Sequence, residues 1–125
     1  MPLPADLAAA FQHIATVVSD LDERYFDTTI KTYKKDIHLD GRKFEFLKLG
    51  YSKSAFYAGI GYEIKVFEPS ATTVNRTWNI WIDNPSSSIA VNRKAVVGAI
   101  QTIIEDPNTA KVSWTVDAGN YADTA

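Results

Sequence analysis

Hydrophobic and polar residues alternate over two stretches in the middle of the chain, residues 56–67 and 74–83. Successive side chains of a β-strand point to opposite faces, so this pattern predicts two long antiparallel strands joined by a turn at Pro69 to Thr72. One face of the pair is apolar over its whole length, and the other is mixed and mostly polar. The apolar face comprises Phe56, Ala58, Ile60, Tyr62, Ile64 and Val66 on the first strand and Val74, Trp78, Ile80 and Ile82 on the second.

Two helices are predicted, one on each side of the strands. In residues 4–25 apolar side chains recur at intervals of three and four, the period of a helix with one buried face. They are Leu7, Phe11, Ile14, Val18, Leu21 and Tyr25. A second helix is predicted from about Arg93 to Glu105, with Asn92 as its N-cap and Pro107 as its stop. Its apolar stripe comprises Val96, Ala99, Ile100 and Ile103.

Residues 28–50 are predicted to form a hairpin, because Thr28 to Tyr33 favour a strand and Asp40-Gly41 is a preferred pair for a two-residue turn. The register of the returning strand is ambiguous. Phe44 and Phe46 share one face while Leu47 and Leu49 share the other, so either a bulge or a strand buried on both faces fits. Gly50 to Ser54 is predicted to be a turn into the long strand, which begins at Ala55.

The segment 108–117 allows two predictions. Val112, Trp114 and Val116 alternate as in a strand, yet a short helix also fits.

The composition is that of a globular protein, with 46% hydrophobic and 22% charged residues. The 125 residues suffice for one domain with a modest core. There is no long apolar run to cross a membrane, and the first residues lack the features of a signal peptide. The chain has no cysteine, so thiolate metal sites and cysteine nucleophiles are excluded.

The charge is unevenly distributed although the net charge is only −2. Residues 31–76 hold nine Lys or Arg against five Asp or Glu, a balance of +4, and the remainder holds four against ten, a balance of −6. The predicted sheet is therefore the basic part of the chain. Such asymmetry is a reason to consider a nucleic-acid surface, although ordinary solvated lysines explain it equally simply.

The broad apolar face of the sheet needs a cover. Strands of about ten residues run on the order of 30 Å at ~3.3 Å per residue, whereas the helix 93–105 is only about 20 Å long at ~1.5 Å per residue. That helix alone is too small. Either the helix 4–25 lies on the same face, or a second copy of the chain supplies a helix in a symmetric dimer.

No catalytic motif is present, and we expect no enzyme activity. Glu63 and Lys65 form an E-x-K triplet that also occurs in metal-dependent nucleases, with Asp83 as a conceivable third ligand, but this match is very weak. The polar face instead suits RNA. Lysine binds phosphate, asparagine reads base edges and an aromatic ring stacks on unpaired bases.

The C-terminal half resembles the coat proteins of single-stranded RNA bacteriophages. The segments that carry the resemblance are residues 62–69 (YEIKVFEP), 79–85, 98–106 and 117–121, in the same order of elements. The likeness covers about residues 55–121, and no single motif in it is diagnostic.

The resemblance implies an α+β fold in which an antiparallel meander sheet is covered by C-terminal helices of a partner subunit. The intertwined dimer would contact through Val96, Ala99, Ile100 and Ile103, and dimers would close into an icosahedral shell. The protein would then be a capsid protein of the virion, made in the cytoplasm of a bacterial host, with its open sheet face turned toward the RNA genome. In well-studied members that face also binds an RNA hairpin and represses replicase translation. The matching RNA-binding positions are Lys43, Glu63, Lys65, Thr77, Asn79 and Trp81.

Two departures from the family pattern matter. Residues 4–25 are predicted to be a helix where the best-known coats begin with a β-hairpin. Thr77 stands where a tyrosine usually stacks on a base, so either Trp81 takes over stacking or specific hairpin recognition is weak or absent.

The family pattern also makes residues 108–117 a short helix, which we adopt. The alternative function is a small protein-binding module, such as an immunity protein or a secretion chaperone.

Overall fold

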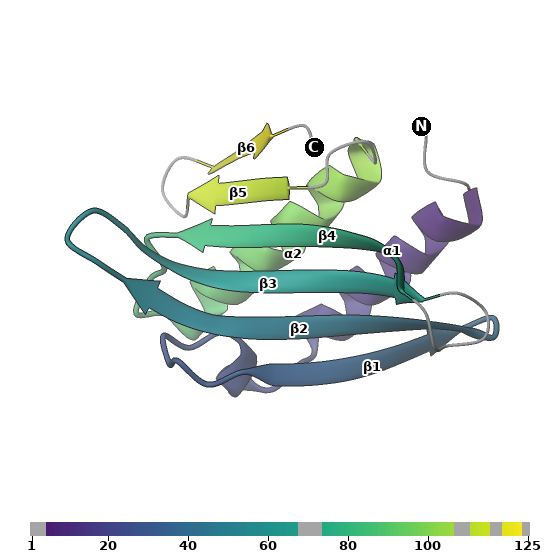
Figure 1. Ribbon diagram of the computed structural model, residues 1–125, viewed down its shortest axis with the longest axis horizontal. Coiled ribbons are helices and arrows are strands. Elements are labelled where there is room, and N and C mark those ends of the chain that lie inside the picture. Colours follow the sequence, from purple (N-terminus) through teal and green to yellow (C-terminus); the bar gives the residue numbers. More distant parts are fainter. Residues whose placement is uncertain (1–4, 68–73, 107–110, 116–118, 124–125) are drawn as a thin grey trace.

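The computed structural model describes residues 5–67, 74–106, 111–115 and 119–123 (Figure 1). The elements, in order, are α1 (Ala5–Ser19), a 3-10 turn η1 (Glu23–Tyr25), β1 (Tyr33–Leu39), β2 (Arg42–Lys53), β3 (Ala58–Phe67), β4 (Val74–Asp83), α2 (Ile89–Glu105), β5 (Lys111–Thr115) and β6 (Gly119–Asp123). The strands form one six-stranded sheet in the order β1-β2-β3-β4-β5-β6. All neighbours are antiparallel except β4 and β5, which are parallel. The predicted α+β class is confirmed, and β1 to β4 form the predicted antiparallel meander, whereas β5 joins the sheet in parallel after the crossover through α2.

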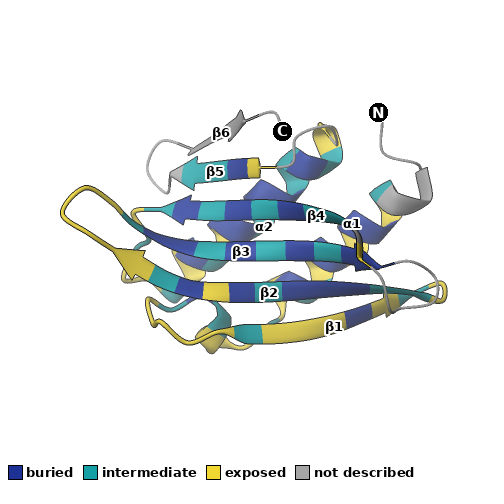
Figure 2. Cartoon of the chain, viewed as in Figure 1, coloured by how far each residue is buried: buried dark blue, intermediate teal, exposed yellow. Residues whose placement is uncertain are grey.

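Both helices lie on the same face of the sheet, behind it in Figure 1. They cover the apolar side chains of β3 and β4, where Ile64 and Trp78 are 0% exposed and Ile80 is 2% exposed. The ring of Phe11 on α1 meets the indole of Trp78 edge-on at a centroid distance of 4.8 Å. Figure 2 shows that buried residues recur along β2, β3 and β4 and on both helices. Of the two ways to cover this face, the chain therefore uses its own N-terminal helix.

This arrangement removes the physical argument for a dimer. Val96, Ala99, Ile100 and Ile103 are each 0% exposed within a single chain, so the surface expected to contact a partner is part of the chain's own core. The expectation failed because α2 is not the only cover. α1 packs beside α2, and two neighbouring helices are wide enough for the sheet.

The apolar row of the sheet is also shorter than predicted. β2 continues through Gly50 to Lys53, and the turn into β3 lies at residues 54–57 instead of 50–54. Phe56 therefore sits in the turn and is 97% exposed, and Val74 at the start of β4 is 42% exposed. Because these two side chains lie outside the covered part of the sheet, the helices have less apolar surface to cover.

The hairpin turn and the register of β2 can now be assigned. Asp40 and Gly41 both have positive φ, 52° and 77°, as a two-residue turn of this kind requires. The register shifts between Lys48 and Gly50, so the bulge was the correct alternative. It places Phe44, Phe46 and Lys48 on the core side and leaves Leu49 46% exposed. Residues 28–32, predicted as strand, precede β1 and are not part of the sheet.

Helix boundaries differ from the predictions at two ends, the C-terminal end of α1 and the N-terminal end of α2. α1 ends at Ser19, and Leu21 and Tyr25 pack against the core from the segment that follows it. α2 begins at Ile89, with Ser88 as N-cap. Asn92 instead lies buried in the first turn, where its amide donates to the carbonyl oxygens of Phe26 and Ser86, each at 2.9 Å.

Residues 111–115 form the strand β5, so the prediction of a short helix over 108–117 is wrong where the structure describes this segment. Val112 is 1% exposed and lies beside Ile80 of β4. Trp114 packs on Gly98 of α2, where an added Cβ would come within 2.6 Å of its ring. The alternation of Val112 and Trp114 was the more reliable signal, because both side chains point toward the core.

Candidate nucleic-acid interface

The face of the sheet away from the helices is open. Directly opposed residues of neighbouring strands share a face, and the register opposes Glu63 to Asn79, Lys65 to Thr77 and Gly61 to Trp81. On the other side of β3, Glu45 of β2 opposes Lys65, and Lys43 shares its face two residues away. The six residues predicted to bind RNA therefore lie on one face, and all six are partly exposed.

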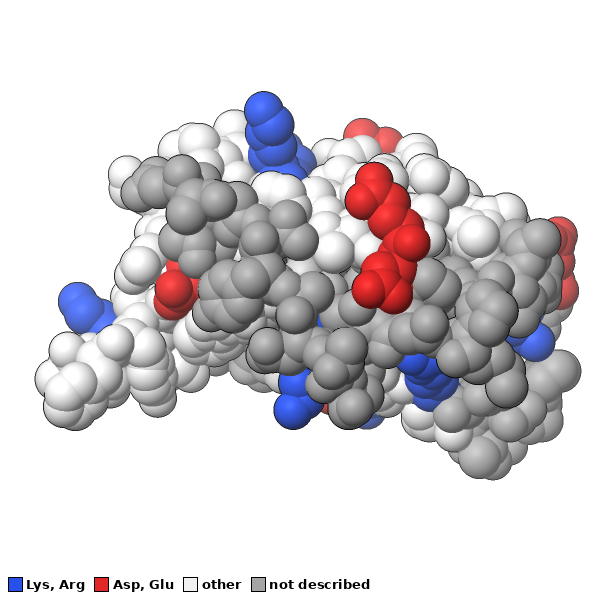
Figure 3. Space-filling model, turned by 90° about the horizontal axis from the view of Figure 1, so that it is seen from above, with Lys and Arg blue, Asp and Glu red and all other residues white. Residues whose placement is uncertain are grey.

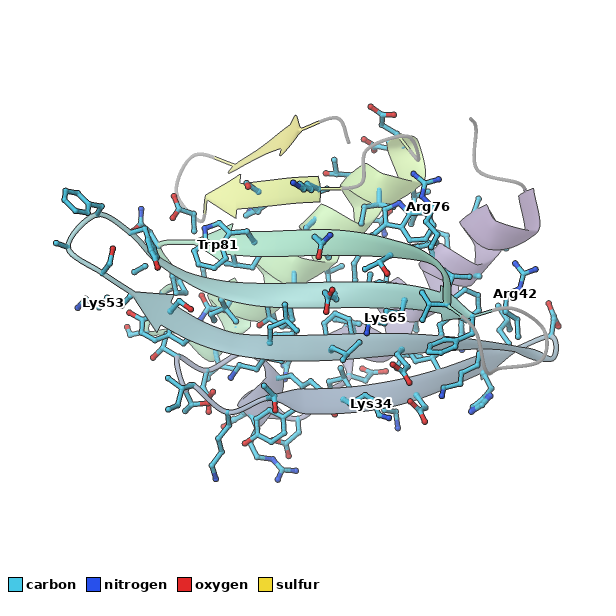
Figure 4. The ribbon with its side chains drawn as sticks, in the orientation of Figure 1. Lys34, Arg42, Lys53, Lys65, Arg76 and Trp81 are labelled. Carbon is cyan, nitrogen blue, oxygen red and sulfur yellow. The ribbon has the colours of Figure 1, made fainter. Side chains whose placement is uncertain are left out.

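Lys65 and Lys43 differ in their surroundings. Lys65 lies near the middle of the sheet (Figure 4) and forms no ion pair within the described residues. The ammonium of Lys43 is 3.1 Å from the carboxylate of Glu45 and 4.5 Å from the ring centre of Phe67. Its side chain is only 20% exposed. Lys65 is therefore the cation most available to a ligand near the centre of the face.

The open face is electrically balanced over β1 to β5. Four lysines (Lys34, Lys43, Lys65, Lys111) stand against four carboxylates (Asp36, Glu45, Glu63, Asp83), a net charge of 4 − 4 = 0. Other basic residues of the sheet lie elsewhere. Lys48 is buried in the core, and the guanidinium of Arg76 lies 4.4 Å from the ring of Trp78. Figure 4 shows Arg42 and Arg76 at one end of the sheet and Lys53 at the other.

Charges of both signs are also present on the surface seen from the β5–β6 side. Basic and acidic side chains are both scattered over the described part of this surface, with no continuous patch of one sign (Figure 3). Attraction to polyanions in general is therefore weak, and any RNA contact depends on particular side chains.

A trough of about 330 Å³ lies on the open face near the C-terminal end of β4. Gly50 of β2 and Gly61 of β3 oppose each other in its lining. Gly61 carries no side chain into the trough, whereas the Cβ position of Gly50 is taken by the backbone of Ile30. Leu49 and Trp81 border it, and Asn79, Ser52, Ser113 and Lys111 add polar groups. Sequence reasoning found Trp81 and Asn79 but missed the rest of the trough.

Glycine makes this shape possible. The indole of Trp81 lies over Gly59, where any Cβ would overlap the ring. Its edge meets the ring of Tyr57 at a centroid distance of 6.0 Å. Three glycines in two adjacent strands, at positions 50, 59 and 61, were the available signal, because glycine inside a strand often marks a close approach of a ligand or another group.

The nuclease alternative finds no support in this geometry. Glu63 lies opposite Asn79, whereas Asp83 is four residues further along β4, about 13 Å away at ~3.3 Å per residue. One magnesium ion cannot bridge carboxylates at such a distance. Within the described residues, no group of three or more His, Asp or Glu side chains is placed to hold a metal ion.

Comparisons with known proteins identify no relative. No family model matches the chain, and neither a curated protein nor a solved structure matches it. Within the described residues, no helix has the length and apolar character needed to cross a membrane. The fold and the open face are therefore the main grounds for a functional proposal.

Proposed function

We propose that this chain is a structural coat protein that binds single-stranded RNA on the open face of its sheet. The observation that carries the proposal is the presence of Lys65, Asn79 and Trp81 on that one face. One supplies a cation, one an amide that both donates and accepts, and one an aromatic ring. Single-stranded RNA offers a matching group to each of them: a phosphate to the cation, a base edge to the amide and a base face to the ring.

Assembly of the coat would use surfaces other than the apolar stripe of α2, since that stripe is buried within the chain. The outer strand β1 presents Lys34, Lys35 and Asp36 to solvent, and the turn at residues 54–57 carries the exposed ring of Phe56.

The RNA contact is tested with Lys65→Ala and Asn79→Ala, measured by fluorescence anisotropy with a labelled single-stranded RNA. Each substitution should weaken binding and leave the melting temperature unchanged. Lys65→Ala should also lower the salt dependence of binding, by about 0.7 in the slope of log affinity against log salt for one phosphate contact.

Lys94→Ala is the matched control, because it removes the same charge from the exposed face of α2, behind the sheet. It should leave RNA binding unchanged. Equal losses of RNA affinity in Lys65→Ala and Lys94→Ala would indicate nonspecific attraction. If Lys65→Ala and Asn79→Ala both bind RNA as tightly as the unaltered protein, RNA does not bind this face.

The coat role makes a separate claim about assembly. The protein expressed alone should elute as particles of uniform size that contain nuclease-protected RNA, visible by electron microscopy. A small species free of nucleic acid would contradict a coat protein.

A protein-binding module is the second candidate, and one observation favours it. The core is complete within one chain, while Phe56 and Ile30 are 97% and 80% exposed. Such a protein would remain a small monomer or dimer with an absorbance ratio at 260 and 280 nm typical of protein alone. The same purification distinguishes the two functions.

A further inference from the structure

The trough between Leu49 and Trp81 has a shape and a set of polar groups that suit a flat ring. Its lining includes the backbone of Gly61, which carries no side chain to fill it. A Cβ at Gly61 would lie 3.6 Å from Leu49 and 3.9 Å from the Trp81 ring, which is ordinary van der Waals contact. A group placed above Gly61 therefore contacts Leu49 on one side and Trp81 on the other without overlap, and both sides are apolar.

The polar groups of the trough are of the kinds that a nucleotide needs. Asn79 can donate to and accept from the edge of a base, and the hydroxyls of Ser52 and Ser113 can do the same. Lys111, also in the lining, is exposed and forms no ion pair within the described residues. A nucleotide combines a base that has hydrogen-bonding edges with a phosphate on its sugar, and this combination matches a trough with apolar sides and an ammonium group in its lining.

We propose that the trough receives one unpaired base of the RNA, in contact with the indole of Trp81 and lying over Gly61, with its phosphate near Lys111. This inference rests on the proposed function, since it assigns a place to one nucleotide of the RNA on the open face. An aromatic side chain of a partner protein fits the apolar walls equally well, but it brings no anion for Lys111. The trough accepts any base, because stacking on an aromatic ring depends little on sequence.

The inference is tested by comparing two labelled ligands of equal length, an oligouridylate and the same sugar–phosphate chain without bases. The unaltered protein should bind the oligouridylate at least about fivefold more tightly, as one stacked base predicts. Gly61→Val should remove this preference by filling the trough, while its affinity for the abasic chain stays the same. Lys65→Ala should weaken binding of both ligands by the same factor.

These results separate the inference from the proposed function. If Gly61→Val folds and keeps the preference for bases, the trough is not the base site, although RNA binding stands. If the unaltered protein binds neither ligand, the proposed function fails as well. A self-association that occurs without RNA and is lost in Gly61→Val would assign the trough to a second copy of the chain.

Photocrosslinking of the unaltered protein covers the case in which Gly61→Val does not fold. An oligonucleotide that contains thiouridine should crosslink to peptides that include Leu49, Trp81 or Ser113. Crosslinks confined to α1 or α2 would overturn the inference.

Discussion

At the scale of single residues, the most unusual feature is the buried ammonium of Lys48. Its Nζ is 2.7 Å from the carboxylate of Asp27, 3.0 Å from the carbonyl oxygen of Arg24 and 3.1 Å from the hydroxyl of Thr29. These contacts use all three donors of a lysine. They hold the segment between η1 and β1 against β2, next to the bulge that forms the trough.

Replacement of Lys48 by methionine should therefore destabilise the protein. The side chain keeps its approximate volume but leaves three acceptors without their donor, so we expect a loss of about 1–3 kcal/mol in the free energy of unfolding. Asp27 is 29% exposed and can regain water, which limits the loss. Urea unfolding measures it, and Lys35→Met on exposed β1 should change stability by less than ~0.5 kcal/mol. An equal effect of both substitutions would contradict this role of Lys48.

The same cluster makes stability depend on pH. Burial by itself raises the pKa of Asp27, but hydrogen bonds from Lys48 and Thr29 and the charge of Lys48 outweigh it, so the pKa lies below its ordinary value. A carboxyl whose pKa is lower in the folded state stabilises the protein above its ordinary pKa, and this contribution is lost as the pH falls.

The unaltered protein and Asp27→Asn should therefore differ most in unfolding free energy near neutral pH, and the difference should shrink below about pH 4. Chemical denaturation at a series of pH values measures this. A difference that stays constant across that range would show that Asp27 does not titrate with folding.

At the scale of elements, the sequence predicted types better than boundaries. The strand β4, the Asp40-Gly41 turn and both helices follow from periodicity and turn chemistry. The turn at 54–57 was misplaced because Gly50, taken as a turn residue, belongs to a bulge inside β2. A bulge depends on pairing with a neighbouring strand, and such pairing is not visible in a single stretch of sequence.

The apolar stripe of α2 was predicted correctly, but the surface that it contacts was predicted incorrectly. Val96, Ala99, Ile100 and Ile103 are the buried face of α2, as expected, but they face their own sheet. Periodicity shows which side of a helix is apolar and leaves open which apolar surface it meets.

Ile100→Asp should consequently act on the fold of a single chain. A charge at a fully buried position without a partner should lower the free energy of unfolding by about 4 kcal/mol or more. Val91→Asp is the control on the same helix, since Val91 is already 38% exposed. If Ile100→Asp leaves the melting temperature of a monomer unchanged but prevents assembly, the stripe contacts a partner instead.

At the scale of the whole molecule, one face of the sheet is covered by the helices of the same chain and the other face is open. The polar composition of the open face was predictable from alternation along β3 and β4. The trough was not, because it depends on the bulge that brings Leu49 beside Gly61 across two strands and on the position of Trp81 over Gly59. The balance of charge on this face also differs from that of the sequence segment, because several basic residues point elsewhere.

The most direct test of the RNA-binding face is a titration of isotope-labelled protein with single-stranded RNA, followed by NMR. The side-chain amide of Asn79 and the indole N–H of Trp81 should shift as RNA is added. The indole of Trp78, buried beneath the helices, and the amides of α2 should stay in place. Shifts concentrated on α1 and α2, with Asn79 and Trp81 unmoved, would contradict the account.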